Sequence, residues 1–95
     1  MKANEFLKKA EQCLVNRGVN YDAKGGERSI SKVVNCFNEI TGKDITNEEG
    51  WMFMVLLKIV RSQQGEPKED NFIDGAAYFS LMGEEATSHK KKQPS

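Results

Sequence analysis

Apolar residues recur along the chain at intervals of three and four positions, which is the spacing of helices with one buried face. The first such segment begins at Asn4, a favourable N-cap residue, and runs to Arg17, where Gly18 is expected to end it. A second begins near Ser29 and ends at Gly42. Their apolar stripes comprise Phe6, Leu7, Ala10, Cys13 and Leu14 in the first, and Ile30, Val33, Val34, Phe37 and Ile40 in the second.

The third helical segment has the clearest start signal in the chain. Residues 46–49 fit a capping box, in which the hydroxyl of Thr46 and the carboxylate of Glu49 each accept a hydrogen bond from a backbone N–H. The residues from Trp51 to Arg61 are apolar on nearly every side of a helix, and the capping box and length favour helix over a buried strand. Such helices lie at the centre of a bundle or in a subunit interface, so we expect the other helices or a second copy of the chain to cover it.

A fourth helix is expected to begin around Asp70 or Asn71, after a loop marked by Gly65 and Pro67. Small residues at positions 75–77 would let a neighbouring helix approach closely. No segment has the pattern of a convincing strand. The sequence therefore predicts an all-α protein that forms a compact bundle of about four helices.

The composition becomes polar and basic at the C-terminal end, where the helical pattern stops. We expect a single helical domain over residues 1–86 and a polar, basic, disordered tail over residues 87–95. The formal net charge of zero includes Lys90–Lys92, and without these three lysines the 14 basic side chains fall to 11 against 14 acidic ones. An acidic body with a short basic tail binds phosphate backbones poorly, so nucleic acid is not an expected partner.

Length and composition exclude several other classes. A chain of 95 residues has room for one domain, and 38% hydrophobic residues exclude collagen-like and wholly disordered proteins. The longest apolar run, Met52 to Leu57, is far shorter than the roughly 20 residues of a membrane span, and no signal-peptide core precedes the first helix. We therefore expect a cytoplasmic protein that does not enter the membrane.

The reactive side chains form no recognisable catalytic or metal-binding pattern. Cys13 and Cys36 fall on the apolar sides of their helices without CxxC spacing, so we expect buried, reduced thiols and neither a disulfide nor a zinc site. His89 lies in the polar tail, where no Ser/His/Asp or Cys/His arrangement can form around it. The sequence predicts no catalytic residue, no metal site and no cofactor.

One charged cluster is a candidate site. Lys58 and Arg61 share a face of the third helix, and Asp70 and Asp74 share a face at the start of the fourth. A short loop makes these helices antiparallel neighbours, so Arg61 is expected near Asp70 or Asp74, with Lys58 one turn further in. The cluster is either a structural ion-pair network or a polar pocket for an anionic ligand. Two carboxylates alone are too few for a magnesium or calcium site.

Two further features have both a structural and a functional interpretation. The connection between the first two helices is rich in charge, and Tyr21, Asp22, Glu27 and Arg28 are either parts of a solvated turn or contributors to an anion site. Trp51, in the first turn of the third helix, either packs in the core or contacts a partner protein.

A pattern of single residues extends over most of the chain, from Arg17 to Glu85. Its residues are Asn16-Arg17-Gly18, Tyr21-Asp22, Gly26-Glu27-Arg28-Ser29, Asn38, Thr41-Gly42, Glu49-Gly50-Trp51, Leu56-Leu57-Lys58, Arg61, Asp70-Asn71, Asp74 and Ala77-Tyr78. The pattern resembles a family of small helical proteins that are encoded by tailed bacteriophages and prophages and are carried as a domain of unknown function. The resemblance implies an accessory phage protein that works in the bacterial host cytoplasm.

The chain also resembles, more faintly, the all-α nucleotide pyrophosphohydrolases of the MazG type. Those enzymes bind magnesium through acids spaced as ExxE on one helix and ExxD on another. This chain has Lys58 and Arg61 where acids would be needed, and Asp70 and Asp74 are four residues apart, so the departure counts against metal-dependent hydrolysis.

Two functions follow as hypotheses. The first is a non-enzymatic accessory protein that binds a host or viral macromolecule, with a protein as the expected partner and a homodimer as a further possibility. The alternative is a nucleotide-binding protein or a degenerate pyrophosphohydrolase. In that case Lys58, Arg61 and Arg28 would contact phosphates, while Asp70 and Asp74 would bind magnesium or orient the cations.

Overall fold

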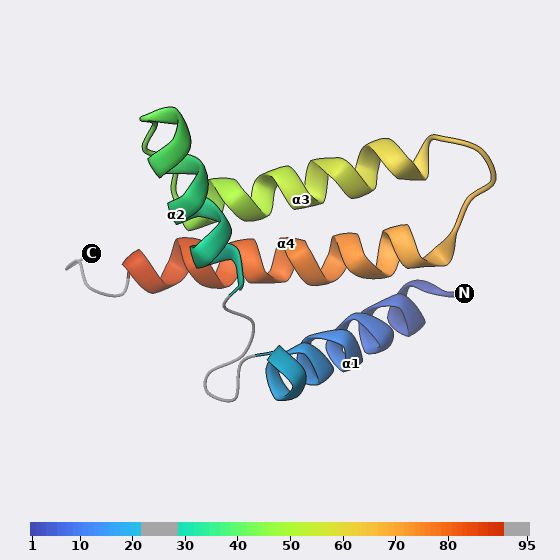
Figure 1. Ribbon diagram of the computed structural model, residues 1–95. Helices are drawn as coiled ribbons and strands as arrows, with labels where there is room; N and C mark the ends of the chain where they lie inside the picture. Colours follow the sequence, from blue (N-terminus) through green and yellow to red (C-terminus); the bar gives the residue numbers. More distant parts are fainter. Residues whose placement is uncertain (22–28, 91–95) are drawn as a thin grey trace.

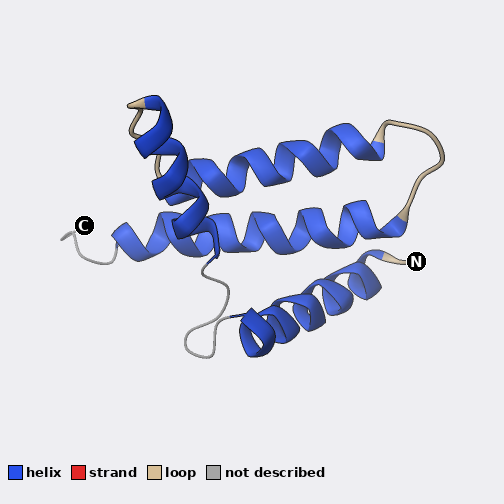
Figure 2. Ribbon diagram, in the orientation of Figure 1, coloured by secondary structure: helices blue, strands red, loops and turns tan. Residues whose placement is uncertain are grey.

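The computed structural model describes the backbone of residues 1–21 and 29–90, and the side chains of residues 1–16 and 29–88. It contains four helices: α1 (Ala3–Tyr21), α2 (Ser29–Thr41), α3 (Asn47–Ser62) and α4 (Glu69–Lys90). α3 and α4 form an antiparallel hairpin, α1 packs along the other side of α4, and α2 crosses the start of α3 (Figure 1). The described residues contain no strand, as Figure 2 shows, so the all-α class is confirmed.

The central helix is α4, which lies between α3 and α1 (Figure 1). Of the two alternatives expected for the apolar helix α3, enclosure by the other helices or cover by a second copy, the first is not what the chain forms, because α4 holds the central place. Buried residues recur along α4 at Ile73, Ala77 and Leu81, and Ala77 is completely buried against Ala10 of α1. The small side chains of both alanines let the two helices approach closely, as the small residues at positions 75–77 predicted. The apolar composition of α3 therefore did not decide which helix is central.

The core consists of two neighbouring clusters along α4. Ala10, Ile73 and Ala77 form the cluster between α1 and α4. The second cluster lies where α2, α3 and α4 meet, and its largest member is Trp51, whose ring stacks on Tyr78 with 5.6 Å between centroids and 23° between planes. Its buried members are Ile30, Val34, Trp51 and Leu81.

Polar contacts fix the corner between α2 and α3. Asn38 clamps the connecting loop, because its side-chain amide donates to the Ile45 carbonyl at 3.0 Å and its oxygen accepts from the Ile45 N–H at 2.9 Å. Gly42 ends α2 with φ = 73°, a conformation that favours glycine. The predicted capping box is confirmed: the Thr46 hydroxyl accepts from the Glu49 N–H, and the Glu49 carboxylate accepts from the Thr46 N–H.

A glycine allows α2 to lie directly on α3. A Cβ atom added at Gly50 would lie 2.7 Å from a methyl group of Val34 and 2.9 Å from Ile30 Cγ1. Both distances are shorter than van der Waals contact, so any larger residue at position 50 would push the helices apart. Asn47 joins the same corner to α4, since its amide donates to Ser31 Oγ at 3.0 Å and to Glu85 Oε1 at 3.3 Å.

Two helices extend further than the sequence suggested. α1 continues through Gly18 to Tyr21, because a glycine inside a helix costs only about 1 kcal/mol. α4 continues through Thr87, where the polar composition predicted a disordered tail, and ends at Lys90. The hydroxyls of Thr87 and Ser88 donate to carbonyls of the preceding turn, so these polar side chains are compatible with helix.

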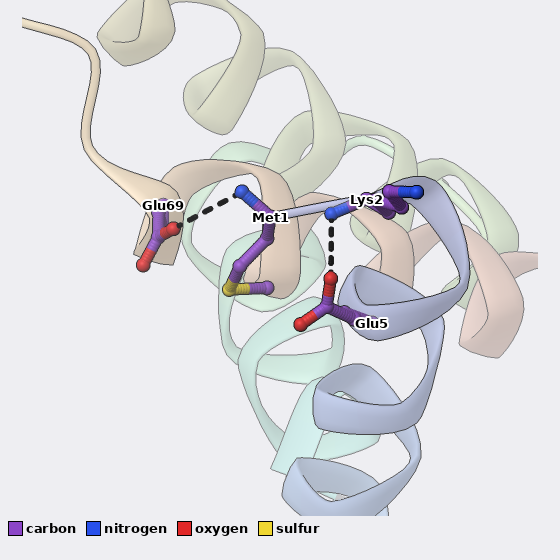
Figure 3. A network of polar contacts seen from close by, with 4 residues as sticks. All are labelled: Met1, Lys2, Glu5 and Glu69. Carbon is purple, nitrogen blue, oxygen red and sulfur yellow. Dashed lines mark hydrogen bonds and ion pairs between the residues drawn. The ribbon is translucent and has the colours of Figure 1, made fainter.

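The chain start is attached to the central helix. The amino group of Met1 lies 3.7 Å from Glu69 Oε2 at the start of α4, and the backbone N–H of Lys2 donates to Glu5 Oε1 at 3.0 Å (Figure 3). These contacts bring the first residues of α1 beside the first turn of α4.

The structure also tests the expectations about membrane spans and about the two cysteines. In the described part of the chain, none of the helices is sufficiently long and apolar to span a bilayer. Cys13 is half-buried beside the α1–α4 cluster, whereas Cys36 is exposed on α2, so the expectation of two buried thiols is wrong for Cys36.

Candidate functional site

The predicted charged cluster contains one ion pair between α3 and α4. Lys58 Nζ lies 3.0 Å from Asp74 Oδ2, and the two side chains are only 13% and 21% exposed. Lys58 follows Trp51 and Val55 on the side of α3 that faces α4. Arg61 comes three residues later, and its position is rotated away from that side by about 60° around the helix axis. The ion pair across the hairpin is therefore made by Lys58, and the expectation that Arg61 would be the closer partner is wrong.

The other two members of the cluster are exposed. Arg61 lies in the last turn of α3 and forms no ion pair with any described residue. Asp70 lies in the first turn of α4 beside Glu69, where a carboxylate interacts favourably with the positive end of the helix dipole. The four residues thus separate into a partly buried pair, Lys58 and Asp74, and two exposed charges near the α3–α4 connection.

An apolar groove runs between α3 and α4 beside the Lys58–Asp74 pair. Its volume is about 400 Å³, within the range of about 300–1,000 Å³ that is common for ligand sites. Gly75 and Ala76 form its floor, and the half-exposed rings of Phe72 and Phe79 stand on either side of them along α4. We call it the α3–α4 groove; it is lined by Val55, Lys58, Ile59, Ser62, Asn71, Phe72, Gly75, Ala76 and Phe79.

The helix register explains why this groove is open. Phe72, Gly75, Ala76 and Phe79 occupy positions i, i+3, i+4 and i+7, and therefore share one face of α4. Two residues without long side chains lie between two aromatic ones, so the face is low in the middle and high at both ends. A Cβ atom at Gly75 would meet only Lys58 Cβ, at 3.6 Å, so the close packing of the helices does not require glycine there.

A polar hollow of about 360 Å³ adjoins the end of the groove nearest the α3–α4 loop. It is lined by Arg61, Gln64, Lys68 and Asn71. Asn71 lines both spaces, so the apolar groove and the hollow are neighbours. The hollow contains two cationic side chains and two amides, a set of donors that suits a carboxylate or a phosphate.

The remaining candidate residues do not join this site. Trp51 is 5% exposed and stacks on Tyr78, so it packs in the core, where its ring cannot contact a partner in this arrangement. Tyr21 is the last residue of α1, and its side chain lies outside the described part of the chain. Asp22, Glu27 and Arg28 also lie outside the described residues.

Metal binding finds no support in the described side chains. Among them, no group of three or more His, Cys, Asp or Glu residues lies close enough to hold a metal ion. Asp74 is paired with Lys58, and a cation in contact with a carboxylate opposes the binding of a second cation.

Sequence reasoning missed the aromatic and amide members of the site. Phe72 and Phe79 were not predicted as site residues, and Asn71 was considered only as a possible start of the fourth helix. A usable signal was present, since the two phenylalanines are seven residues apart with small residues between them. Lys68 could not be placed, because it lies in the loop and no periodicity applies there.

Together these observations define a small all-α domain with an apolar groove between two of its helices and a basic hollow at one end of that groove. The chain belongs to the DUF6378 family, a domain of unknown function, whose family model matches residues 5–86. That span contains every residue of the groove and the hollow. Neither the curated proteins nor the solved structures include a significant match to the chain.

Proposed function

We propose that the protein is a non-enzymatic binding module, and that its α3–α4 groove binds an amphipathic helix of a partner protein. The observation that carries this proposal is that the apolar groove and the basic hollow adjoin at Asn71, which lines both. Groove-bound helices present apolar residues at i, i+3 or i+4, and i+7, and the groove offers apolar walls along a comparable length. No cofactor is needed for this role.

The charges select the chemistry of the partner. Arg61 and Lys68 lie at one end of the groove, and Arg61 has no acidic partner among the described residues. An acidic residue at the corresponding end of the bound helix would pair with these cations, and would fix the direction in which the helix lies. The proposed ligand is therefore an apolar helical segment with a carboxylate near one end.

A selection from a display library of random short peptides tests this proposal directly. We expect the enriched peptides to share apolar residues at helical spacing and an acidic residue near one end. Phe79→Glu should abolish their binding, because it places a charge on the apolar wall. Arg61→Glu should weaken the binding of the acidic peptides. The substitution should leave the fold intact, because Arg61 is exposed.

Phe53→Glu is the matched control, because Phe53 and Phe79 are both 63% exposed and Phe53 lies on the opposite side of α3. Peptide binding that survives Phe79→Glu, or that shows no preference for acidic residues, contradicts the proposal.

The biological setting forms part of the same proposal. The resemblance to phage and prophage proteins implies that the partner is a host or viral macromolecule in the bacterial cytoplasm. The genes that flank members of this family in bacterial and phage genomes test this setting. Neighbours devoted to housekeeping functions alone would count against it.

A nucleotide is the second candidate ligand, because the hollow also suits a phosphate. Arg61 and Lys68 would contact the phosphate, and the neighbouring apolar groove would accept the base. In this alternative, Asp70 and Asp74 would hold magnesium or orient the cations, and the contact of Asp74 with Lys58 favours the second role. A thermal-shift screen of nucleotides with and without magnesium separates the two candidates: a shift that Arg61→Glu removes favours the nucleotide, and a flat screen together with peptide binding favours the helix.

A further inference from the structure

The side of α3 that faces away from α4 carries large apolar side chains from Met52 to Val60 that are only partly covered, and Glu49 lines one hollow with the first of them. Five large apolar side chains on this side are exposed. Their spacing of three and four residues is that of a coiled-coil seam, which pairs with a second helix. The five residues are Met52, Phe53, Leu56, Leu57 and Val60.

This surface continues onto α2. Val33 and Phe37 of α2 and Phe53 of α3 line one apolar hollow of about 260 Å³ between the two helices. Ile40, on the same side of α2, is 83% exposed. We call these eight residues the α2–α3 face: Val33, Phe37, Ile40, Met52, Phe53, Leu56, Leu57 and Val60.

The area of the α2–α3 face matches what a stable dimer needs. Taking about 200 Å² for a fully exposed large apolar residue, the exposed fractions of the eight residues correspond to roughly 850 Å². The largest apolar patch on a typical monomer is about 300–600 Å². A standard protein interface buries about 800 Å² on each partner, so this face is large enough to form one by itself.

We infer that the α2–α3 face binds a second copy of this chain, with the two α3 helices antiparallel about a twofold axis near Leu56. A twofold axis pairs the face with itself, which suits its eight apolar residues, and the charges that adjoin the face, such as Glu49, lie at its ends. This dimer uses the side of α3 opposite the α3–α4 groove, and Arg61, at the end of the helix, is the residue that both proposals use.

The charges at the ends of α3 select the antiparallel arrangement. Glu48 and Glu49 lie in its first turn, and Arg61 lies in its last turn. Antiparallel helices place the acidic end of each copy beside the basic end of the other and oppose the two helix dipoles. A parallel pair would bring like charges together at both ends.

Sedimentation of the full chain over a range of concentrations tests the dimer. We expect a reversible monomer–dimer equilibrium, and we expect Phe53→Glu to weaken it by about 30-fold or more, the effect of losing an interface hot spot. The helical circular dichroism signal of Phe53→Glu should match that of the wild type, because position 53 is largely exposed in the monomer.

Phe79→Glu is the matched control for the dimer, since it introduces the same charge at an equally exposed ring in the α3–α4 groove. It should leave the dimer unchanged while it abolishes peptide binding, and Phe53→Glu should do the reverse. The two proposals therefore fail separately. A chain that stays monomeric at all concentrations, a dimer that Phe53→Glu leaves intact, or a different protein that occupies the α2–α3 face of a monomer would each overturn the inference.

Disulfide trapping tests the orientation. In chains that carry Cys13→Ala and Cys36→Ser, an equal mixture of Met52→Cys and Val60→Cys proteins should oxidise mainly to the mixed dimer, because residues 52 and 60 are equidistant from Leu56. A parallel pair would instead give the two symmetric disulfides, and that result would overturn the antiparallel arrangement.

Discussion

The two sides of α3 differ in which kind of residue they bury: one side buries a charged residue, and the other leaves apolar residues exposed. The side that faces α4 carries Lys58, whose ammonium group is largely buried against Asp74. The opposite side carries five large apolar residues, and all of them are exposed. A helix in a monomeric protein usually buries its apolar side. The neighbours available to α3 within one chain, and not its own hydrophobicity, therefore decide which of its residues are buried.

The largest expected difference between the two sides concerns Trp51. We expect Trp51→Ala to lower the free energy of unfolding by about 3–5 kcal/mol, because it removes a buried ring that stacks on Tyr78. Urea denaturation followed by circular dichroism measures this loss. A loss below about 1 kcal/mol would mean that the covered side of α3 is no better packed than the exposed one.

Gly50 tests how closely α2 packs on the start of α3. Gly50→Ala should lower the free energy of unfolding by about 1–3 kcal/mol, because the added methyl group overlaps Val34 and Ile30. Gly83→Ala is the matched control in α4, where an added Cβ has no neighbour within 4 Å. The control should stabilise the protein by about 0.5–1 kcal/mol through helix propensity. Equal effects in the two thermal unfolding curves would refute the close approach of α2 to α3.

The Lys58–Asp74 pair predicts a smaller effect on the covered side. Lys58→Met keeps the length of the side chain and removes its charge, so it should cost about 1–2 kcal/mol, the contribution of a charge-assisted hydrogen bond that retains some contact with water. Arg61→Met is the control and should change the stability by less than about 0.5 kcal/mol. A comparison of urea midpoints decides the matter; if Arg61→Met proves the more damaging of the two, the ion pair has been assigned to the wrong cation.

The smallest effect is expected on the exposed side. Phe53→Ala should change the stability of the dilute monomer by less than about 0.5 kcal/mol, even though it removes an aromatic ring. At higher concentration the same variant should lose the concentration dependence of the melting temperature that a dimer confers. Calorimetry at two protein concentrations measures both quantities. A large loss in the dilute sample would show that Phe53 is covered within a single chain.

The sequence predicted the local features of the fold well, because these depend on neighbouring residues. The capping box at Thr46, the end of α2 at Gly42 and the all-α class all follow from residues a few positions apart. The choice of α4 as the central helix does not. Periodicity identifies the apolar residues of a helix, but the contact between Ala10 and Ala77 joins segments that are far apart in the chain.

The candidate site was predicted only in part, for a related reason. Spacing placed Lys58 and Arg61 on one helix and Asp74 on the next, but it could not fix the rotation of each helix about its own axis. That rotation gives the ion pair to Lys58 and leaves Arg61 in the polar hollow. The groove itself depends on what lies between Phe72 and Phe79, and a stripe of apolar residues does not distinguish a filled face from a hollow one.

The central position of α4 has a consequence for the order in which the protein folds. The ribosome makes α1, α2 and α3 before α4, and most of the buried surface of α1 and α3 lies against α4. During synthesis α2 can already pack on α3, but the sides of α1 and α3 that face α4 have no partner until α4 emerges. Nascent chains should leave these sides of α1 and α3 open to chaperones and proteases until α4 has been made, and should then complete their core in one step.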